Sequence, residues 1–199
     1  MNQKHKTLLG LVTFVVFIAA AVLAYTVLQN NNAPDNLVIL GVQNGEYTPE
    51  EPGLTPDDEP EHMQAPNFTM LDAEGNELQL SDFFGKPIVL NFWATWCPAC
   101  VRETSYFQWL YEEHGDDVHV IKINLLDGQR ETRAGVDNFM YENGYTFPLF
   151  FDVDGAAAYG VRGIPITFFI DEHGYGIAAA QGSMNRQTLQ QGLEAIGVQ

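Results

Sequence analysis

The stretch Ile88-Val89-Leu90-Asn91-Phe92-Trp93-Ala94-Thr95-Trp96-Cys97-Pro98-Ala99-Cys100 contains the only two cysteines of the chain, with two residues between them. Its first six residues form an apolar run, which predicts a buried strand. From Pro98 to about His114, apolar residues recur at three- and four-residue steps, which predicts a helix. We therefore place Cys97 near the N-cap and Pro98 in the first helical turn, where a missing N–H costs nothing.

This placement suits dithiol–disulfide exchange. Unpaired N–H groups and the positive end of the helix dipole favour a thiolate at Cys97, which is the species that attacks a disulfide. Cys100, one turn along, can then attack the mixed disulfide and release the substrate. Other uses of the pair fit less well: a zinc site wants four ligands, haem attachment needs His where Val101 stands, and a structural disulfide more often closes a longer loop.

The N-terminal segment predicts insertion into a membrane. No charged side chain occurs from Thr7 to Pro34, and residues 8–28 are almost wholly apolar, which is about the length that spans a bilayer. Basic residues precede this run and all 26 acidic residues follow it. Because basic residues stay inside, we expect a cytoplasmic tail at 1–6, a transmembrane anchor at 7–28 and a single-pass protein with its catalytic domain outside the cell membrane.

A signal peptide is the alternative for this segment. Val22-Leu23-Ala24 provides small residues at plausible cleavage positions, but the apolar run exceeds the usual signal core of about 7–15 residues. Either interpretation exports the rest of the chain to a compartment where disulfides persist.

Residues 29–64 are predicted to form an acidic, proline-rich linker. Eight acidic residues, no Lys or Arg and several prolines lie in this range, so it cannot bury enough apolar surface to fold alone. The apolar group at 37–40 is an exception that could dock elsewhere. The net charge of −17 argues against nucleic acid as a partner and disfavours docking on anionic lipid.

Residues 65–199 are predicted to form a layered α/β domain, because strand and helix patterns alternate along them. Besides the strand at 88–93 and the helix at 98–114, we expect a hairpin (68–71 with 77–80), strands at 118–125, 166–170 and 176–181, and helices at 130–142, 154–159 and 187–196. Pro165 precedes a strand that should be central, where a cis bond would explain it. A trans proline at a strand start is the commoner case, and the residues alone leave both open.

Residues 91–100 and the run Gly163-Ile164-Pro165-Ile166-Thr167-Phe168 together closely resemble the thioredoxin superfamily. More narrowly, they resemble its membrane-anchored, extracytoplasmic thiol-disulfide oxidoreductases of the ResA/TlpA type. The resemblance covers about 65–198 and implies a thioredoxin-like fold: a central mixed sheet flanked by helices, an N-terminal hairpin extension and a central insertion. It also implies a cis Pro165 beside the cysteines, with the Ile164 backbone presented to an extended substrate. We expect Trp96 and Pro98 to complete this docking surface.

Two further positions bear on proton transfer. Thioredoxin carries a buried Asp where this chain has Asn91, which cannot titrate. The exported reductases instead carry a Glu three residues after the second cysteine, and Glu103 matches. Cys100 and Glu103 share one helical face, so a partly buried carboxylate there would have a raised pKa and could exchange protons with a thiol. The alternative is a solvated Glu103 that stabilises the helix dipole.

The resemblance implies a reductase in which Cys97 attacks, Cys100 resolves and Glu103 manages protons. Its substrates would be disulfides of exported proteins, such as the haem-binding cysteines of apocytochrome c or an envelope or spore-coat enzyme. A membrane thiol-electron carrier would re-reduce it, and no cofactor or metal is expected beyond the Cys97–Cys100 disulfide.

Three other functions are weighed against this one. A disulfide-forming oxidase typically has a His between its cysteines, and Pro98-Ala99 offers none. A copper-delivery module spaces its cysteines by three residues and adds a His from a loop. A thiol peroxidase would have Thr three residues before its cysteine, where this chain has Ala94.

Overall fold

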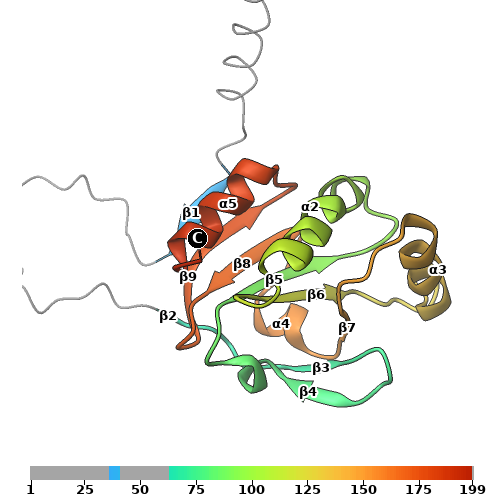
Figure 1. Ribbon diagram of the computed structural model, residues 1–199. Helices are drawn as coiled ribbons and strands as arrows, with labels where there is room; N and C mark the ends of the chain where they lie inside the picture. Colours follow the sequence, from blue (N-terminus) through green and yellow to red (C-terminus); the bar gives the residue numbers. More distant parts are fainter. Residues whose placement is uncertain (1–35, 41–62, 199) are drawn as a thin grey trace, which may run out of the picture. The chain divides into compact units, whose positions relative to one another are not determined.

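The computed structural model describes residues 36–40 and 63–198, which form one mixed β-sheet with helices packed on it (Figure 1). The strands run in the order β1-β9-β8-β5-β6-β7-β3-β4, and β2 also pairs with β9. Their bounds are β1 Leu37–Ile39, β2 Met63–Gln64, β3 Thr69–Leu71, β4 Glu77–Gln79, β5 Ile88–Trp93, β6 His119–Asn124, β7 Leu149–Asp152, β8 Ile166–Ile170 and β9 Tyr175–Gln181. The helices are the 3-10 helix η1 Leu80–Phe83 and the α-helices α2 Pro98–His114, α3 Arg133–Asn143, α4 Gly155–Ala158 and α5 Arg186–Ala195.

The strand that leads to the cysteines lies in the middle of this sheet. β5 is parallel to β6 and antiparallel to β8, and all six of its residues are buried. A strand with neighbours on both edges and cover on both faces needs apolar residues on both faces, which explains the continuous run at 88–93. This confirms the predicted strand and the mixed sheet.

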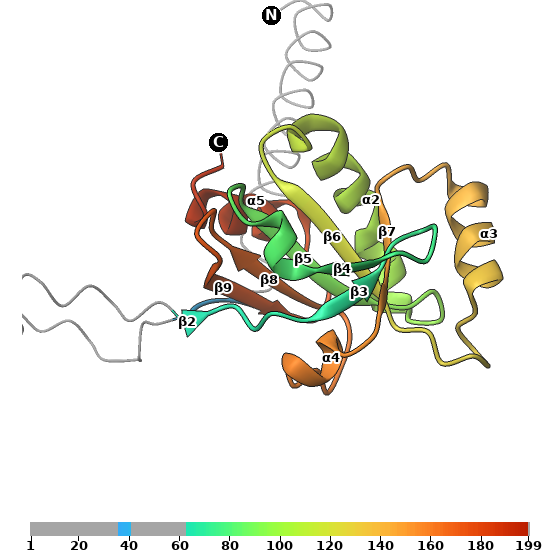
Figure 2. The ribbon, with the colours of Figure 1, turned by 90° about the horizontal axis from the view of Figure 1, so that it is seen from below.

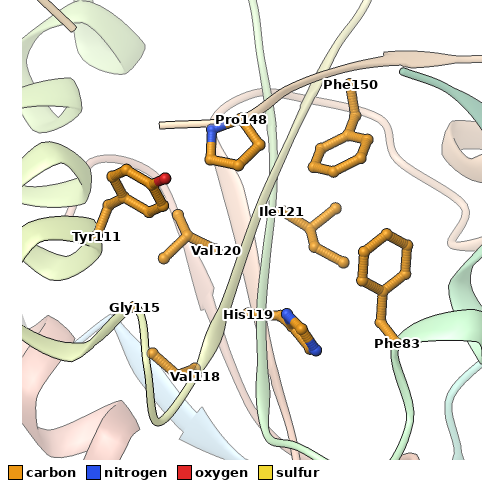
Figure 3. A pocket seen from close by; sticks show the side chains of 9 residues that line it. All are labelled: Phe83, Tyr111, Gly115, Val118, His119, Val120, Ile121, Pro148 and Phe150. Atoms are coloured by element: carbon orange, nitrogen blue, oxygen red, sulfur yellow. The ribbon is translucent and has the colours of Figure 1, made fainter. Parts of the chain in front are cut away.

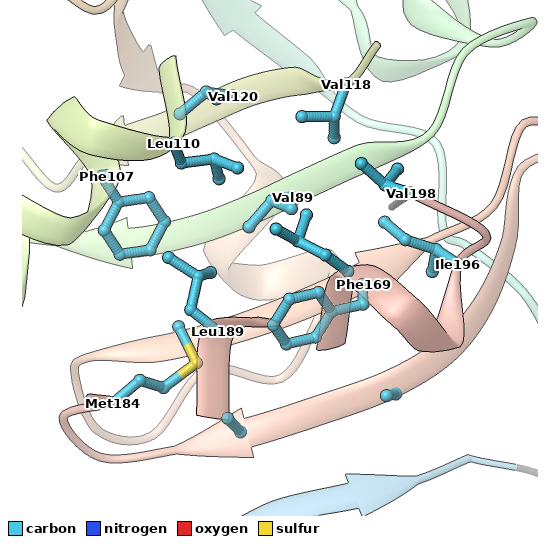
Figure 4. Packing of buried hydrophobic residues seen from close by; sticks show 13 residues of the cluster. Val89, Phe107, Leu110, Val118, Val120, Phe169, Met184, Leu189, Ile196 and Val198 are labelled. Atoms are coloured by element: carbon cyan, nitrogen blue, oxygen red, sulfur yellow. The ribbon is translucent and has the colours of Figure 1, made fainter. Parts of the chain in front are cut away.

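One face of the sheet is covered by α2 and α5 (Figure 4). Phe107 of α2 and Leu189 of α5 pack with Val89 of β5 and Phe169 of β8 in one buried cluster. The apolar positions of both helices recur at helical spacing, so each helix turns one stripe toward the sheet. The predicted helices at 98–114 and 187–196 are thereby confirmed.

The opposite face is covered by the segments around β3, η1 and α4 (Figure 2). The ring of Phe92 lies 6.1 Å from that of Phe68 and 5.7 Å from that of Tyr159, measured between centroids. Successive β5 side chains alternate between the two faces, so Phe92 points away from α2. β3 and β4 pair antiparallel, as predicted for the hairpin.

Two details of the sheet and helices differ from the prediction. β7 was not predicted: its four residues follow Pro148, and it pairs parallel with β6 and antiparallel with β3, which are distant in the sequence. The helix expected at 130–142 begins at Arg133, because Thr132 caps it by accepting a hydrogen bond from the Gly135 N–H at 3.2 Å.

Two stretches within the predicted linker range 29–64 pair with β9. Leu37–Ile39 forms β1 and Met63–Gln64 forms β2, both antiparallel to it. The apolar group at 37–40 therefore does dock, and its backbone hydrogen-bonds at a sheet edge.

The predicted cytoplasmic tail at 1–6, the anchor at 7–28 and the rest of the linker lie outside the described residues. Within 36–40 and 63–198, no helix has the length and apolar character needed to cross a membrane.

Candidate active site

The two cysteines lie where β5 passes into α2, as predicted. Cys97 is the N-cap of α2, Pro98 occupies its first turn, and the Sγ of Cys97 accepts a hydrogen bond from the Cys100 N–H at 3.2 Å. The sulfurs are joined in a disulfide, and the two Cα atoms are 5.3 Å apart. When this bond is reduced, the same N–H groups at the helix N-terminus favour a thiolate at Cys97.

The predicted substrate-binding residues gather around Cys97. The Ile164–Pro165 bond is cis, and the Ile164 carbonyl oxygen lies 3.7 Å from the Cys97 Sγ. Pro165 is buried, and its carbonyl oxygen accepts a hydrogen bond from the Gly182 N–H at 2.9 Å, which ties this loop to the end of β9. Cys97 is 5% exposed, whereas Trp96 is 43% exposed.

Around this sulfur the structure brings together all four predicted docking residues. Trp96 and Pro98 flank Cys97 in the chain and are exposed, and Ile164 is half-buried. A sulfur beside an exposed ring and a half-buried loop residue lies where it can meet a disulfide carried by another polypeptide.

Glu103 follows Cys100 by three residues in α2 and is fully buried. Its Oε1 accepts a hydrogen bond from the Asn91 side-chain amide at 3.0 Å, and its Oε2 accepts one from the Met184 N–H at 2.9 Å. The alternative of a solvated first-turn acid is therefore wrong. Burial raises the pKa of Glu103, although the Lys122 charge and these hydrogen bonds oppose the shift.

Lys122 of β6, which was not among the predicted site residues, completes a buried polar chain. Its Nζ is fully buried and donates to the Asn91 Oδ1 at 2.8 Å. The same Nζ lies 4.0 Å from the ring centre of Phe107 and 4.8 Å from that of Trp93. Burial lowers the pKa of Lys122 to about 7, and the nearby Glu103 charge opposes this shift.

The orientation of Asn91 follows from its partners. An ammonium can only donate and a carboxylate can only accept, so the Asn91 carbonyl faces Lys122 and its amide faces Glu103. The amide also donates to the Thr167 Oγ1 at 2.9 Å. Asn91 therefore does not titrate itself but links the two groups that do.

The sequence offered a signal for this lysine. The only charged side chain in the buried run Val120-Ile121-Lys122-Ile123 is Lys122, and an unpaired lysine is almost never fully buried. Glu103, Asn91 and Lys122 form what we call the buried relay.

Comparisons with known proteins agree with this geometry. A family model described as the AhpC/TSA family matches residues 62–175. The chain belongs to the AhpC/TSA family. It is 37% identical over 135 residues to the thiol-disulfide oxidoreductase ResA of Geobacillus thermodenitrificans, which covers 66% of this chain and 75% of that protein. It is 33% identical over 139 residues to ResA of Bacillus subtilis, which covers 68% of this chain and 75% of that protein.

Solved structures show the same fold. The crystal structure of StoA from Bacillus subtilis matches with a TM-score of 0.55 and 29% identity, covering 64% of this chain and 96% of that one. This member of the AhpC/TSA family is thus a thiol-disulfide oxidoreductase of the ResA type with a thioredoxin-like fold, and its redox pair is Cys97 and Cys100.

A second buried carboxylate braces the loop that carries Cys97. Glu131 is fully buried and accepts hydrogen bonds from the Thr95 N–H at 2.8 Å and the Thr95 hydroxyl at 2.7 Å. The Asn124 side-chain amide also donates to it. Neither Thr95 nor Glu131 was predicted as a site residue, because nothing local to residue 131 shows which loop it meets.

A small pocket lies away from the cysteines (Figure 3). It has a volume of about 70 Å³ and lies where β6 begins and α2 ends, beside His119 and Tyr111. The sulfurs lie at the other ends of these elements, and the pocket contains none of the site residues described above. It therefore adds nothing to the dithiol chemistry.

Proposed function

We propose that this protein reduces disulfides of exported proteins on the outer side of the cell membrane. The observation that carries the proposal is the buried carboxylate of Glu103 on the helix face it shares with Cys100. A sulfur at a helix N-terminus beside exposed residues, with a proton-exchanging group on the helix face of its partner, meets the needs of a dithiol reductant.

The chemistry balances in two exchanges. The Cys97 thiolate attacks one sulfur of the substrate disulfide, and the other substrate sulfur leaves as a thiolate. Cys100 gives its proton to Glu103 and then attacks the Cys97 sulfur, which releases the second substrate thiolate. The substrate gains two electrons, and the enzyme is left with the Cys97–Cys100 disulfide seen in the structure.

The surroundings of the pair favour the reducing direction. A side chain between the cysteines that stabilises the thiolate would stabilise the reduced enzyme and make it an oxidant, and Pro98-Ala99 supplies none. An ionised Glu103 near the sulfurs disfavours a thiolate and so destabilises the reduced form. Both effects make the reduced enzyme a better electron donor.

The partners are proposed on the ResA-type resemblance together with the apolar N-terminal segment. We propose a single-pass anchor at 7–28, a membrane thiol-electron carrier that re-reduces Cys97–Cys100, and apocytochrome c as a substrate, its haem-binding cysteines being kept reduced for cytochrome c maturation. In this proposal one reaction supplies thiol electrons across the membrane and another consumes the reduced cysteines.

The reduction potential of the Cys97–Cys100 couple tests the direction. The full-length protein is equilibrated with glutathione or dithiothreitol buffers, and the thiol fraction is read by alkylation. A potential of about −270 mV or lower is expected for a reductase. A potential near about −120 mV would make the protein a disulfide-forming oxidant and overturn the proposal.

A further inference from the structure

Arginines gather around the dithiol in a chain that is acidic overall. The chain has 9 basic and 26 acidic residues. Four segments carry the cysteines or contact the residues around them: 94–102, 125–133, 160–166 and 182–185. They carry four arginines, which we call the arginine rim: Arg102, Arg130, Arg133 and Arg162. In the rest of the described residues the basic side chains are Lys86, Lys122 and Arg186, and carboxylates far outnumber them.

Arg130 contacts the segment that carries Cys97. Its guanidinium is stacked 4.2 Å from the ring centre of Trp96, the residue before Cys97. The stack and the neighbouring Glu131–Thr95 hydrogen bonds hold the charge at the edge of the site. The Arg130 side chain is 66% exposed, so a bound polypeptide can reach it.

Arg162 approaches from the loop that ends at Pro165. It is exposed and stands two residues before Ile164, whose carbonyl oxygen is 3.7 Å from the Cys97 Sγ. No acidic residue occurs at 160–166. A polypeptide that meets Cys97 therefore passes between a cation on the Trp96 side and one on the Pro165 side.

The nearby carboxylates compensate part of this charge: Arg130 and Arg133 each have a carboxylate within 4 Å, whereas Arg102 and Arg162 have no ion-pair partner among the described residues. Two carboxylates lie on the four segments: Glu131 is buried against Thr95, and Asp127 pairs with Arg130 at 3.1 Å. Glu103, one residue beyond 94–102, is also buried. Asp137 of α3 lies 3.6 Å from Arg133. Near the end of β7, the Oδ1 of Asp152 accepts a hydrogen bond from the Ala156 N–H. The Oδ1 of Asp154 accepts one from the Thr69 N–H. Those last two carboxylates lie beyond the four segments.

We propose that the arginine rim selects protein disulfides that are flanked by acidic residues. The inference rests on the proposed function and specifies its substrate class. A positive potential at the site raises the local concentration of acidic segments and their encounter rate. In water, one charge pair at about 6 Å changes an association rate by about threefold, and two pairs by about tenfold.

The test uses three peptides with the same intramolecular disulfide, flanked by Asp, Ser or Lys. Their second-order rate constants with the reduced full-length protein are measured at about 10 mM and about 500 mM salt, where the Debye length falls from about 30 Å to a few ångströms. At low salt the Asp peptide is expected to react about tenfold faster than the Ser peptide and the Lys peptide about tenfold slower, with nearly equal rates for all three at high salt.

Variants assign the effect to the arginine rim. Arg130→Gln and Arg162→Gln are each expected to reduce the Asp-to-Ser ratio about threefold. This ratio does not depend on any change in overall activity. Arg186→Gln is the matched control, because Arg186 is exposed and stacks on Trp109 at 3.9 Å but lies on α5, outside the rim. It should leave the ratio unchanged.

The outcomes separate this inference from the proposed function. Hydroxyethyl disulfide, which is small and uncharged, reports on dithiol chemistry alone in the unmodified protein. Equal rates for the three peptides, with normal turnover of this compound, would overturn the arginine rim only. No turnover of this compound would overturn the proposed function. A ratio that Arg186→Gln reduces as much as Arg130→Gln would also overturn the rim, since it would reflect net charge.

Discussion

The two sulfurs of one disulfide have different surroundings. Cys97 is 5% exposed and lies beside the exposed Trp96 ring and the Ile164 carbonyl, where another polypeptide can reach it. Cys100 is fully buried, on the helix face that carries Glu103. The difference favours a division of labour: one side of the pair meets the partner, and the other side moves a proton within the protein.

The buried relay on the Cys100 side costs folding free energy. Burying a charged group costs several kcal/mol before its partners offset it, and an apolar core of the same shape is often at least as stable as a buried ion pair. Lys122 nevertheless lies among Phe107 and Trp93 with one hydrogen bond to Asn91. The buried relay is therefore hard to explain by stability, which supports a role in the chemistry.

The largest expected effect separates the two sulfurs. Cys97→Ser should lower the rate of insulin reduction by about a thousandfold or more, because it removes the attacking group. Cys100→Ser should keep the attack but stop the resolution, so mixed disulfides with partner proteins should accumulate on Cys97. Insulin turbidity and non-reducing gels measure these outcomes.

The opposite pattern would reverse the assignment. If Cys97→Ser still reduced insulin, or if mixed disulfides accumulated on Cys100 in that variant, Cys97 would not be the attacking sulfur. The Cys97→Ser/Cys100→Ser double variant controls for partners that bind without a covalent bond.

A smaller effect is expected from Glu103→Gln. The ionised carboxylate disfavours a nearby thiolate, so its loss should move the titration of the cysteines to lower pH by about one unit. Alkylation rates measured from pH 5 to about pH 10 would detect the shift. An unchanged profile would mean that Glu103 serves structure alone.

Stability against pH gives a second measurement on this residue. Because the folded-state pKa of Glu103 is raised above its ordinary value of 4.5, the native state binds the proton more tightly than the unfolded chain. The free energy of unfolding should therefore fall as the pH rises from 4.5 through the folded pKa. Glu103→Gln should remove that dependence.

Lys122→Met is the matched change at the other end of the buried relay. The folded-state pKa of Lys122 is about 7 against an ordinary 10.5, so the unfolded chain binds this proton more tightly. Its contribution to stability should rise with pH between about 7 and 10.5, and Lys122→Met should abolish that rise. Each single variant should cost about 1–3 kcal/mol, and the double variant with Glu103→Gln should cost less than their sum. Additive costs would show that Asn91 does not couple the two groups.

The features of the two sulfurs that could be predicted are those whose sequence pattern lies within one segment of the chain. The N-cap position of Cys97 and the helix face shared by Cys100 and Glu103 depend on spacing within one helix, and both were predicted. The sequence left open whether Glu103 is buried or solvated, because its partners Asn91 and Met184 come from distant segments that only the folded chain brings together. The family resemblance predicted Glu103 as a site residue, and the structure shows its burial and its hydrogen bonds.

Other features were missed for related reasons. β7 has four residues and pairs with two strands distant in the sequence, so no periodicity within it distinguishes it from a loop. Glu131 follows a polar loop and has no local pattern either. Lys122 is different, since a charge inside an apolar strand is visible in the sequence and could have been selected.

The smallest expected effect concerns the brace on the exposed side. Glu131→Gln keeps the size of the side chain, but its amide cannot accept the bonds from both the Thr95 N–H and the Thr95 hydroxyl, so the loop before Cys97 should loosen. We expect the rate of Cys97 alkylation to change about three- to tenfold, and Thr95→Val, which removes only the hydroxyl bond, to have a smaller effect in the same direction. Thr132→Ala is the control, because it removes the α3 cap at a cost of about 1 kcal/mol but touches no residue of the Cys97 loop. If Thr132→Ala changed the alkylation rate as much as Glu131→Gln, the brace would act through stability alone, and the difference between the two sulfurs would not depend on how the Cys97 loop is held.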